Sequence, residues 1–388
     1  MKVLKICIGT WENASRDSRE LSVCRDLGAE IVVLAKGNAD DRGREDEVNG
    51  YKVMRYTTRP YKKLPVGINR IISIFQWAKY AATLKADVIT GHDIGGWTIG
   101  WLSKFYSKKK KPVLVYDSHE FELGRNSKRS KIQLGMIKFW EKKCIKKSAF
   151  TIVVNDSIAD EIVKIYKLKE RPVVVRNIPN RWTVDESVCA EKRKELLEMF
   201  PEKDDAFLIM YHGAVVPGRD VERVIELVSI NPEVKAVILG NCSDEYKKKL
   251  TDLVDSFGVN DRVAFHKAVP LVELWKYVGA VNVGMILARA TCKNHLYSLP
   301  NKLFENIQAG TPVVCPNYPA FKSIVEKYKN GLMCDPEDMN SINECVDKLR
   351  TDNKLYNELK DNALKAKEEL NWEKERNLLI SAYSDLLK

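Results

Sequence analysis

The sequence predicts an α/β protein built from two doubly wound domains, each with a parallel sheet covered by helices on both faces. Short runs rich in β-branched residues recur along the chain, and amphipathic helical segments separate them. Near-continuous apolar strands are typical of parallel sheets that are buried on both faces. The alternation pauses around residues 178 to 206, where "IPNRWTVDE" and a charged helix precede the next strand. This pause predicts the boundary between two similar halves.

The expected strands follow one another in order along both halves. In the first half they cover residues 2–9, 29–35, 87–93, 112–120, 150–156 and 172–177. In the second half they cover residues 207–213, 235–241, 262–268, 281–287 and 311–317. We therefore expect an N-terminal domain at residues 1–185 and a C-terminal domain at residues 186–371. A last amphipathic helix at 372–388 carries an apolar stripe made of Leu378, Leu379, Ala382, Tyr383 and Leu386.

The bulk composition limits the classes of partner. The 388 residues carry a formal net charge of +11, with 45% hydrophobic and 30% charged residues, as in ordinary globular proteins. The charge predicts a surface that attracts nucleic acid, an anionic membrane or a phosphorylated small molecule. Because the basic runs are dispersed and contain no nucleic-acid-binding motif, we do not expect nucleic acid among the partners.

The cysteines and the apolar runs indicate the compartment. Nine cysteines occur without CxxC spacing or a paired framework, which favours a reducing cytosol and argues against a structural zinc. The segment "MKVLKICIGTWEN" has too short an apolar run for a signal peptide. No run approaches the roughly 18 apolar residues of a membrane span. We therefore expect a cytoplasmic protein, peripheral at the membrane at most.

Polar side chains directly after the strands are the first candidates for a site, because ligands bind at the carboxyl ends of strands in open α/β sheets. In the first half these candidates are Gly9, Thr10, His92, Asp93, His119, Glu120, Asn155, Asp156 and Asn177. In the second half they include His212, Gly213, Gly240 and Asn241, together with the stretch from 288 to 302.

The stretch "SLPNKLFENIQAG", residues 298–310, predicts a helix from Pro300 to residue 309 that ends at Gly310. Lys302 lies in the first turn, where the partial positive charge of the helix N-terminus repels a cation unless an anion binds next to it. The exposed N–H groups of this turn favour phosphate as that anion. Glu305, one turn later, can accept hydrogen bonds from a vicinal diol, as acidic residues do for ribose. The pair suits a nucleotide diphosphate. Spacing alone, however, favours the simpler interpretation of a solvated Lys/Glu pair.

Residues 298–338, "SLPNKLFENIQAGTPVVCPNYPAFKSIVEKYKNGLMCDPED", resemble the donor-binding segment of retaining GT-B glycosyltransferases of glycosyltransferase family 4. A thinner resemblance extends over most of the chain. It implies a GT-B fold with two Rossmann-like domains facing across a cleft. It also implies that the C-terminal domain holds a nucleotide-sugar donor, that the N-terminal domain holds the acceptor, and that the helix at 372–388 crosses back onto the first domain.

The resemblance also implies roles for single residues. Glu305 matches the family glutamate that binds the ribose hydroxyls, whereas Tyr297 stands where the family has a second glutamate. The family has two cationic residues at the positions of Ala214 and Arg219. Ala214 carries no charge, so only the cation at Arg219 is retained, and Lys302 is expected to supply the lost charge. The resemblance further places His119 near the donor sugar. Donor contacts are expected from Gly213, Gly240, Tyr297 and the backbone of Ser298, and the acceptor side is expected at Gly9, Thr10, His92, Asp93 and Glu120.

The activity implied by the resemblance is retaining transfer of a hexosyl group to a glycan or lipid-linked acceptor, in the synthesis of a cell-surface polysaccharide or glycoconjugate. His119, Arg219 and Lys302 are the expected catalytic residues. The chain has no Asp-x-Asp motif, so we expect no essential metal and no cofactor besides the nucleotide-sugar. Because Tyr297 and Ala214 depart from the family pattern, a non-catalytic partner subunit is an alternative. A nucleotide-sugar 2-epimerase on the same fold is another.

Basic runs gather in the first half, at residues 59–63, 107–112, 125–131 and 141–148. They are interleaved with the aromatic residues Trp97, Trp101, Phe105, Phe139 and Trp140. Such a surface can bind anionic lipid at the inner face of the membrane. Ordinary solvated lysine-rich helices remain an equal alternative.

Overall fold

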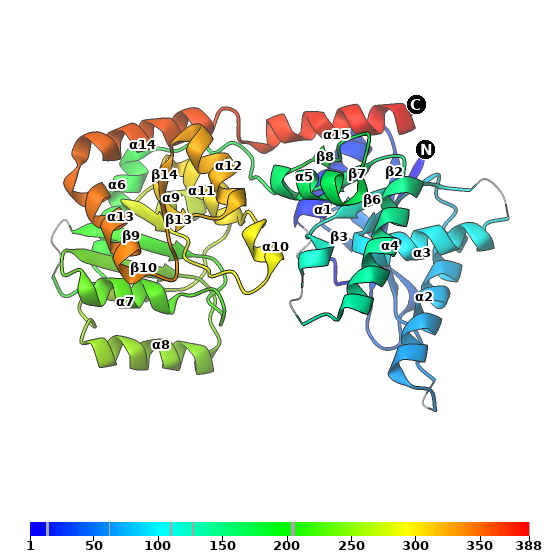
Figure 1. The fold of residues 1–388 in the computed structure, drawn as a ribbon, viewed down its shortest axis with the longest axis horizontal. Helices are drawn as coiled ribbons and strands as arrows, with labels where there is room; N and C mark the ends of the chain where they lie inside the picture. The colour runs from blue at the N-terminus through cyan, green and yellow to red at the C-terminus, as the bar shows by residue number, and fades with distance from the viewer. Residues whose placement is uncertain (13–14, 62, 109–110, 126–127, 203–205, 388) are drawn as a thin grey trace. The chain divides into compact units, whose positions relative to one another are not determined.

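The computed structural model describes residues 1–12, 15–61, 63–108, 111–125, 128–202 and 206–387. The chain divides into two compact units (Figure 1). Unit 1 comprises Met1–Arg176 and Glu375–Lys388, and unit 2 comprises Asn177–Lys374. The division falls nine residues before the boundary predicted from the sequence. The reason is that the segment after Asn177 forms its hydrogen bonds within unit 2. Trp182 N donates to Gln308 Oε1 at 2.9 Å, and Trp372 N donates to Pro179 O at 3.0 Å.

Unit 1 contains an eight-stranded sheet in the order β3-β4-β2-β1-β5-β6-β7-β8. Its strands are β1 (Lys2–Cys7), β2 (Glu30–Lys36), β3 (Arg42–Val48), β4 (Tyr51–Tyr56), β5 (Val88–His92), β6 (Val113–Ser118), β7 (Thr151–Val153) and β8 (Val173–Val174). Every pairing is parallel except that of β3 with β4. These two strands form an edge hairpin that was not among the strands predicted from the sequence.

The helices of unit 1 are α1 (Ser15–Asp26), α2 (Val66–Thr83), α3 (Asp93–Tyr106), α4 (Lys131–Lys147), α5 (Asp156–Tyr166) and the unit 1 part of α15 (Trp372–Leu387). Glycines bring α3 onto the sheet. A Cβ at Gly91 would lie 2.3 Å from the Trp97 backbone, and one at Gly96 would lie 2.5 Å from Ile6 O. This close approach fixes the start of α3, and with it His92 and Asp93, beside the carboxyl end of β1.

Unit 2 contains a six-stranded sheet in the order β11-β10-β9-β12-β13-β14, and all its pairings are parallel. Its strands are β9 (Phe207–His212), β10 (Val234–Leu239), β11 (Val263–His266), β12 (Val283–Met285), β13 (Val313–Pro316) and β14 (Gly331–Cys334). Its helices are α6 (Glu186–Leu197), α7 (Glu222–Ile230), α8 (Asp244–Phe257), α9 (Leu274–Val278), α10 (Lys293–Leu296), α11 (Asn301–Ala309), α12 (Pro319–Tyr328), α13 (Met339–Thr351) and α14 (Asn353–Ala366). Two doubly wound units confirm the predicted fold class.

Helix α11 begins and ends as its flanking residues predict. Pro300 is the N-cap residue and has an extended backbone, so it does not interrupt the helix. Gly310 follows the last helical residue with φ 74°, a left-handed conformation that glycine adopts without strain. Leu303, Phe304 and Ile307 are fully buried and anchor α11 in the core of unit 2. Among the described helices, none is both long enough and apolar enough to span a bilayer.

Candidate active site

The first turn of α11 presents Lys302 next to the carboxyl end of β9. Its Nζ lies 3.7 Å from the ring centroid of Tyr211, a cation–π contact. Gly213 lies beside Lys302, since a Cβ there would be in ordinary contact with Lys302 Nζ at 3.8 Å, and its φ of 115° is a conformation that favours glycine. Among the described residues, no carboxylate forms an ion pair with Lys302. Burial and the neighbouring charge of Arg219 lower the pKa of Lys302 to about 7, although Glu305 acts in the opposite direction.

This arrangement favours an anionic ligand. Arg219 is exposed in the loop after β9 and lies near enough to Lys302 for their like charges to repel. The N-terminus of α11 has no side-chain cap, so its first N–H groups are not satisfied by a capping side chain. Two cations and a helix N-terminus therefore converge without a carboxylate between them, and an anion bound there would relieve the repulsion.

Glu305 lies one turn further along α11 and is buried, with only 8% of its surface exposed. Its Oε2 lies 2.9 Å from Nε2 of His212, the last residue of β9. The carboxylate is therefore paired with a histidine, and not with Lys302 as a solvated i,i+3 pair would be. His212 was among the strand-end residues in the sequence, but nothing in the spacing linked it to Glu305.

The remaining donor-side candidates lie around the same strand ends. A Cβ at Gly240 would lie 1.8 Å from Gly213 O, so the loops after β9 and β10 approach too closely for any side chain. Tyr297 directly follows the short helix α10. Ser298 follows it, and its backbone N donates to His295 O at 3.3 Å while its hydroxyl donates to Asn294 O at 2.8 Å. The Ser298 N–H, expected to contact a donor, is thus engaged within its own turn.

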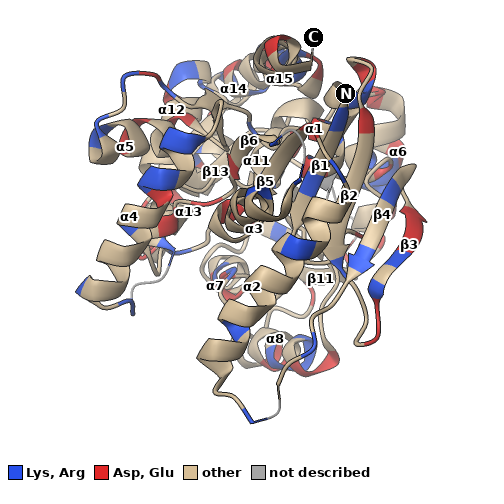
Figure 2. Ribbon diagram, turned by 90° about the vertical axis from the view of Figure 1, so that its right-hand side faces the viewer, with Lys and Arg blue, Asp and Glu red and all other residues tan. Residues whose placement is uncertain are grey.

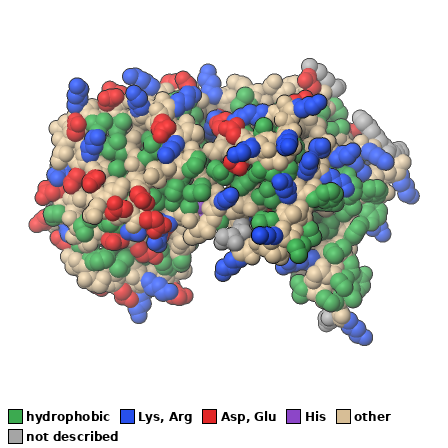
Figure 3. Space-filling model, in the orientation of Figure 1, with side chains coloured by type: hydrophobic (Ala, Val, Ile, Leu, Met, Phe, Trp, Pro, Cys, Tyr) green, Lys and Arg blue, Asp and Glu red, His purple; other side chains and the backbone are tan. Residues whose placement is uncertain are grey.

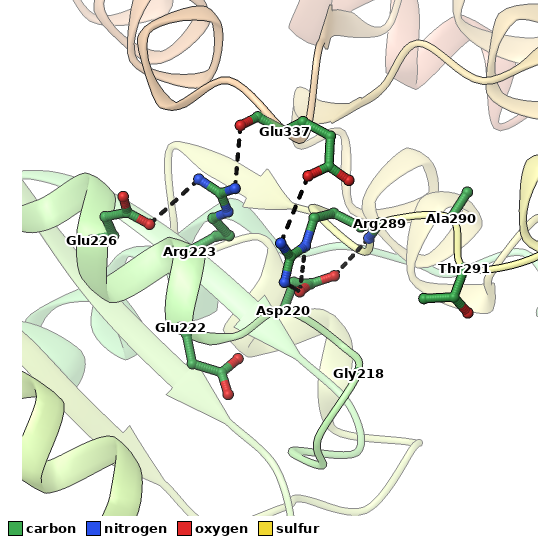
Figure 4. A pocket seen from close by; sticks show the side chains of 9 residues that line it. All are labelled: Gly218, Asp220, Glu222, Arg223, Glu226, Arg289, Ala290, Thr291 and Glu337. Carbon is green, nitrogen blue, oxygen red and sulfur yellow. Dashed lines mark hydrogen bonds and ion pairs between the residues drawn. The ribbon is translucent and has the colours of Figure 1, made fainter.

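A cavity of about 740 Å³ adjoins this region within unit 2 (Figure 4). Its lining residues are Gly218, Asp220, Glu222, Arg223, Glu226, Arg289, Ala290, Thr291 and Glu337. Asp220 accepts hydrogen bonds from the Arg289 backbone N at 2.6 Å and Nε at 2.9 Å, and Arg289 also reaches Glu337 at 3.7 Å. These contacts join the Arg219 loop to the segment before α10. Asp220 was not among the residues predicted from the sequence, whereas Arg289 lies in the predicted stretch from 288 to 302 without having been singled out there.

In unit 1, a buried charge cluster lies beneath the carboxyl ends of β1 and β6. Lys5 Nζ contacts Asp17 Oδ1 at 2.7 Å, Glu20 Oε2 at 2.7 Å and Asp117 Oδ2 at 2.6 Å, and Lys5 has no exposed surface. Tyr383 of α15 donates to Glu20 Oε1 at 2.7 Å and so ties the last helix into the cluster. A lysine at this position can be buried because carboxylates surround its charge.

His92 and His119 lie over this cluster with their ring centroids 3.7 Å apart. Nε2 of His119 lies 2.7 Å from Asp117 Oδ2 and 3.3 Å from Asp17 Oδ1. Burial alone would lower the pKa of His119, but the charge of Asp117 and the hydrogen bonds to Asp117 and Asp17 raise it to about 9. His119 is therefore an imidazolium at neutral pH, a hydrogen-bond donor and not a base.

Asp17, His92, Asp117 and His119 offer ligand atoms within 4.8 Å of one another, a spacing that could suit a metal ion. The Lys5 ammonium already contacts the carboxylates of Asp17 and Asp117, where a cation would sit. The donor set thus fits an internal lysine better than a metal.

The other acceptor-side candidates lie at the same edge of unit 1. Asp93 Oδ1 accepts from the His119 backbone N at 2.9 Å, and Arg125 bridges Asp93 at 3.3 Å and Glu120 at 2.7 Å. Gly9 and Thr10 are exposed in the loop after β1. The structure therefore brings the unit 1 candidates together at one sheet edge and the unit 2 candidates together at another.

Comparison with known protein families identifies the chain. The model "Glycosyl transferases group 1" matches residues 192–366, and "Glycosyltransferase Family 4" matches residues 22–180. The chain is a GT-B glycosyltransferase of the family 4, group 1 type. The resemblance seen in the sequence is confirmed.

Curated relatives of this glycosyltransferase include two other glycosyltransferases. An uncharacterized glycosyltransferase of Methanocaldococcus jannaschii is 24% identical over 411 residues, covering 98% of both chains. The D-inositol 3-phosphate glycosyltransferase of Thermobifida fusca is 24% identical over 206 residues, covering 50% of this chain and 46% of that protein.

Solved structures share the fold of this glycosyltransferase. Anabaena HepE in complex with UDP and glucose has a TM-score of 0.75 at 14% identity, covering 99% of this chain and 100% of HepE. Sucrose-phosphate synthase from Thermosynechococcus elongatus has a TM-score of 0.73 at 15% identity, covering 100% of this chain and 99% of that one. At these identities the likeness establishes the GT-B fold.

Proposed function

We propose that this glycosyltransferase transfers a hexosyl group, with retention, from a nucleotide-diphosphate sugar to a glycan or lipid-linked acceptor. The observation that carries the proposal is Lys302, a cation without a carboxylate partner among the described residues, beside Arg219 at the start of α11. Crystal structures of the structurally similar HepE with UDP and with UDP-glucose support a nucleotide-sugar donor. The biological setting that we propose is synthesis of a cell-surface polysaccharide or glycoconjugate in the cytoplasm.

In this proposal the donor diphosphate lies at the N-terminus of α11. Departure of the nucleotide diphosphate places negative charge near Lys302 and Arg219, which are fixed in advance and stabilise that charge. Glu305 accepts hydrogen bonds from the ribose hydroxyls. His119, held as an imidazolium by Asp117, donates a hydrogen bond to a substrate oxygen. The leaving phosphate takes the acceptor proton, so the reaction needs no separate base, and Lys302 and Arg219 supply the positive charge that a metal would otherwise bring to the diphosphate.

Turnover of nucleotide-sugars tests these roles. Lys302→Ala, Arg219→Ala and Glu305→Ala are each expected to lose about 10²-fold in kcat/KM, whereas Lys322→Ala on the exposed side of α12 leaves it unchanged. Near wild-type rates in all three site variants would contradict the proposal. Donor consumption without an acceptor that yields an isomerised nucleotide-sugar would instead indicate an epimerase.

We also propose that unit 1 binds an anionic membrane surface through α2, α3 and α4. Large apolar side chains are exposed on all three helices. They are Val66, Ile68, Ile71 and Phe75 on α2, Phe105 and Tyr106 on α3, and Ile132, Met136 and Phe139 on α4. Figure 3 shows hydrophobic and basic side chains gathered over α2 and α4.

The charge on these helices is complementary to anionic lipid. Helix α2 contains no acidic residue, and the only acid of α4, Glu141, is fully buried. Lysines recur along α4, as Figure 2 shows in blue: Lys131, Lys138, Lys142, Lys143, Lys146 and Lys147. Basic residues around exposed apolar side chains are typical of surfaces that insert shallowly between anionic headgroups.

Co-sedimentation with vesicles tests this surface. Phosphatidylglycerol-containing vesicles should bind the wild-type protein and release it at high salt, whereas pure phosphatidylcholine vesicles should bind weakly. The Ile132→Ser, Met136→Ser, Phe139→Ser triple variant should bind at least about tenfold less, since three apolar side chains no longer insert. Val272→Ser, which changes a 79% exposed side chain in unit 2, is the matched control. Equal binding by the triple variant and the control would contradict the proposal.

A further inference from the structure

The contact between His212 and Glu305 joins the end of β9 to the second turn of α11. His212 is 2% exposed and Glu305 is 8% exposed, and their side-chain atoms Nε2 and Oε2 lie 2.9 Å apart. Among the described residues, neither side chain has another hydrogen-bond partner. A carboxylate can only accept, so Nε2 of His212 carries the hydrogen.

This hydrogen bond has a direct consequence for Lys302. Residues three apart on a helix are neighbours, so Glu305 could otherwise turn toward Lys302 and form an ion pair. That pair would neutralise the cation at the N-terminus of α11. The structure instead shows Lys302 on the ring of Tyr211 and Glu305 on His212. His212 and Tyr211, adjacent in β9, thus hold apart the two charged side chains of α11.

The same bond leaves one oxygen of Glu305 available. Oε2 is held by His212, while Oε1 has no hydrogen-bond partner among the described residues. A buried carboxylate with a fixed orientation loses less conformational freedom when it accepts further hydrogen bonds. Such a group suits a diol better than a mobile surface glutamate does.

We propose that His212 is a positioning residue, which orients Glu305 toward the ribose of the donor and keeps it from pairing with Lys302. The inference rests on the proposed function, because it assumes that a nucleotide diphosphate binds at α11. His212 touches neither reacting atoms nor substrate in this scheme. Its effect on binding passes through Glu305 and Lys302.

The test compares UDP with 2′-deoxy-UDP, which lacks one ribose hydroxyl. Binding of both to the wild-type protein, to His212→Phe and to His212→Gln is measured by isothermal titration calorimetry. The ratio of the two dissociation constants does not depend on the fraction of folded protein, so a loss of stability leaves it unchanged. His212→Gln keeps an amide N–H that can reach Glu305 and serves as the conservative variant.

We expect the wild-type protein to prefer UDP over 2′-deoxy-UDP by about tenfold, the effect of one hydrogen bond to a charged acceptor. His212→Phe should bind UDP about tenfold more weakly and lose most of this preference, and His212→Gln should recover part of both. An unchanged preference in His212→Phe would overturn the positioning role while leaving the proposed function intact. Failure of UDP, ADP and GDP alike to bind the wild-type protein would overturn the proposed function and this inference with it.

Discussion

Donor binding should weaken as the pH rises above 7, because Lys302 must be charged to hold a diphosphate. Burial and the charge of Arg219 lower the pKa of Lys302 to about 7 in the free protein, and a bound anion must raise it. Below pH 7 Lys302 is already charged and binding has its full strength. Above pH 7 the complex must take up a proton, so affinity falls by about tenfold, or about 1.4 kcal/mol, for each pH unit.

Calorimetric titration with UDP-glucose measures this linkage between pH 6 and 8. UDP-glucose is the suitable probe because its diphosphate, unlike the terminal phosphate of UDP, does not titrate in this range. Repeating the titration in buffers with different ionisation enthalpies gives the number of protons taken up. We expect nearly one proton per complex at pH 8 and almost none at pH 6.

Two variants isolate the contribution of Lys302. Lys302→Arg should bind with little dependence on pH, because a guanidinium stays charged throughout this range. Lys302→Met should bind weakly at every pH, and Lys322→Met should behave like the wild-type protein. A dissociation constant that stays constant from pH 6 to 8 in the wild-type protein, with no proton uptake, would show that Lys302 does not change its charge when the donor binds.

Two further predictions concern the stability of unit 1. Lys5→Met should lower the free energy of unfolding by about 3–5 kcal/mol in urea titrations, because three buried carboxylates lose the cation that they share, and Arg16 and His119 remain only beside Asp117 and Asp17. Lys2→Met, at a part-exposed ion pair with Glu30, should change it by less than about 1 kcal/mol, and equal effects would contradict the assigned role of Lys5. Burial raises the pKa of Glu141 to about 7, so the wild-type protein should lose up to about 3 kcal/mol relative to Glu141→Gln as the pH rises from about 4.5 to 7. A difference in stability that stays constant over that range would show that Glu141 does not titrate in this way.

Local patterns in the sequence predicted much of the fold. Most of the apolar parallel strands and the start and end of α11 follow from strand composition, Pro300 and Gly310, although the short parallel strand β14, "GLMC", was not predicted. The β3–β4 hairpin was missed because β3 is polar, with the sequence "RGREDEV", and reads as a loop by hydrophobicity. The sequence nevertheless contains a turn signal, the dipeptide Asn49-Gly50. In the structure both residues adopt positive φ, as a two-residue hairpin turn requires.

The pairings within the candidate site could not be predicted from spacing. His212 and Glu305 are 93 residues apart, and Asp220 and Arg289 are 69 apart, so only the packing of the sheet brings them together. Lys5 is a different case. A lysine inside the apolar strand "KVLKIC" must be buried, and burial of its charge requires carboxylates nearby. That signal was available in the sequence, although it does not identify which carboxylates surround Lys5.

We expect a nucleotide-sugar to bind at the N-terminus of α11. A thermal-shift screen of the whole protein against a panel of nucleotide-sugars tests it most directly, since a ligand at 100 times its dissociation constant stabilises the folded state by about 2.7 kcal/mol. We predict that at least one nucleotide-sugar raises the melting temperature of the wild-type protein, and that the Arg219→Ala, Lys302→Ala double variant does not respond. No response to any of the panel, or an equal response in the double variant, would show that α11 does not hold the donor.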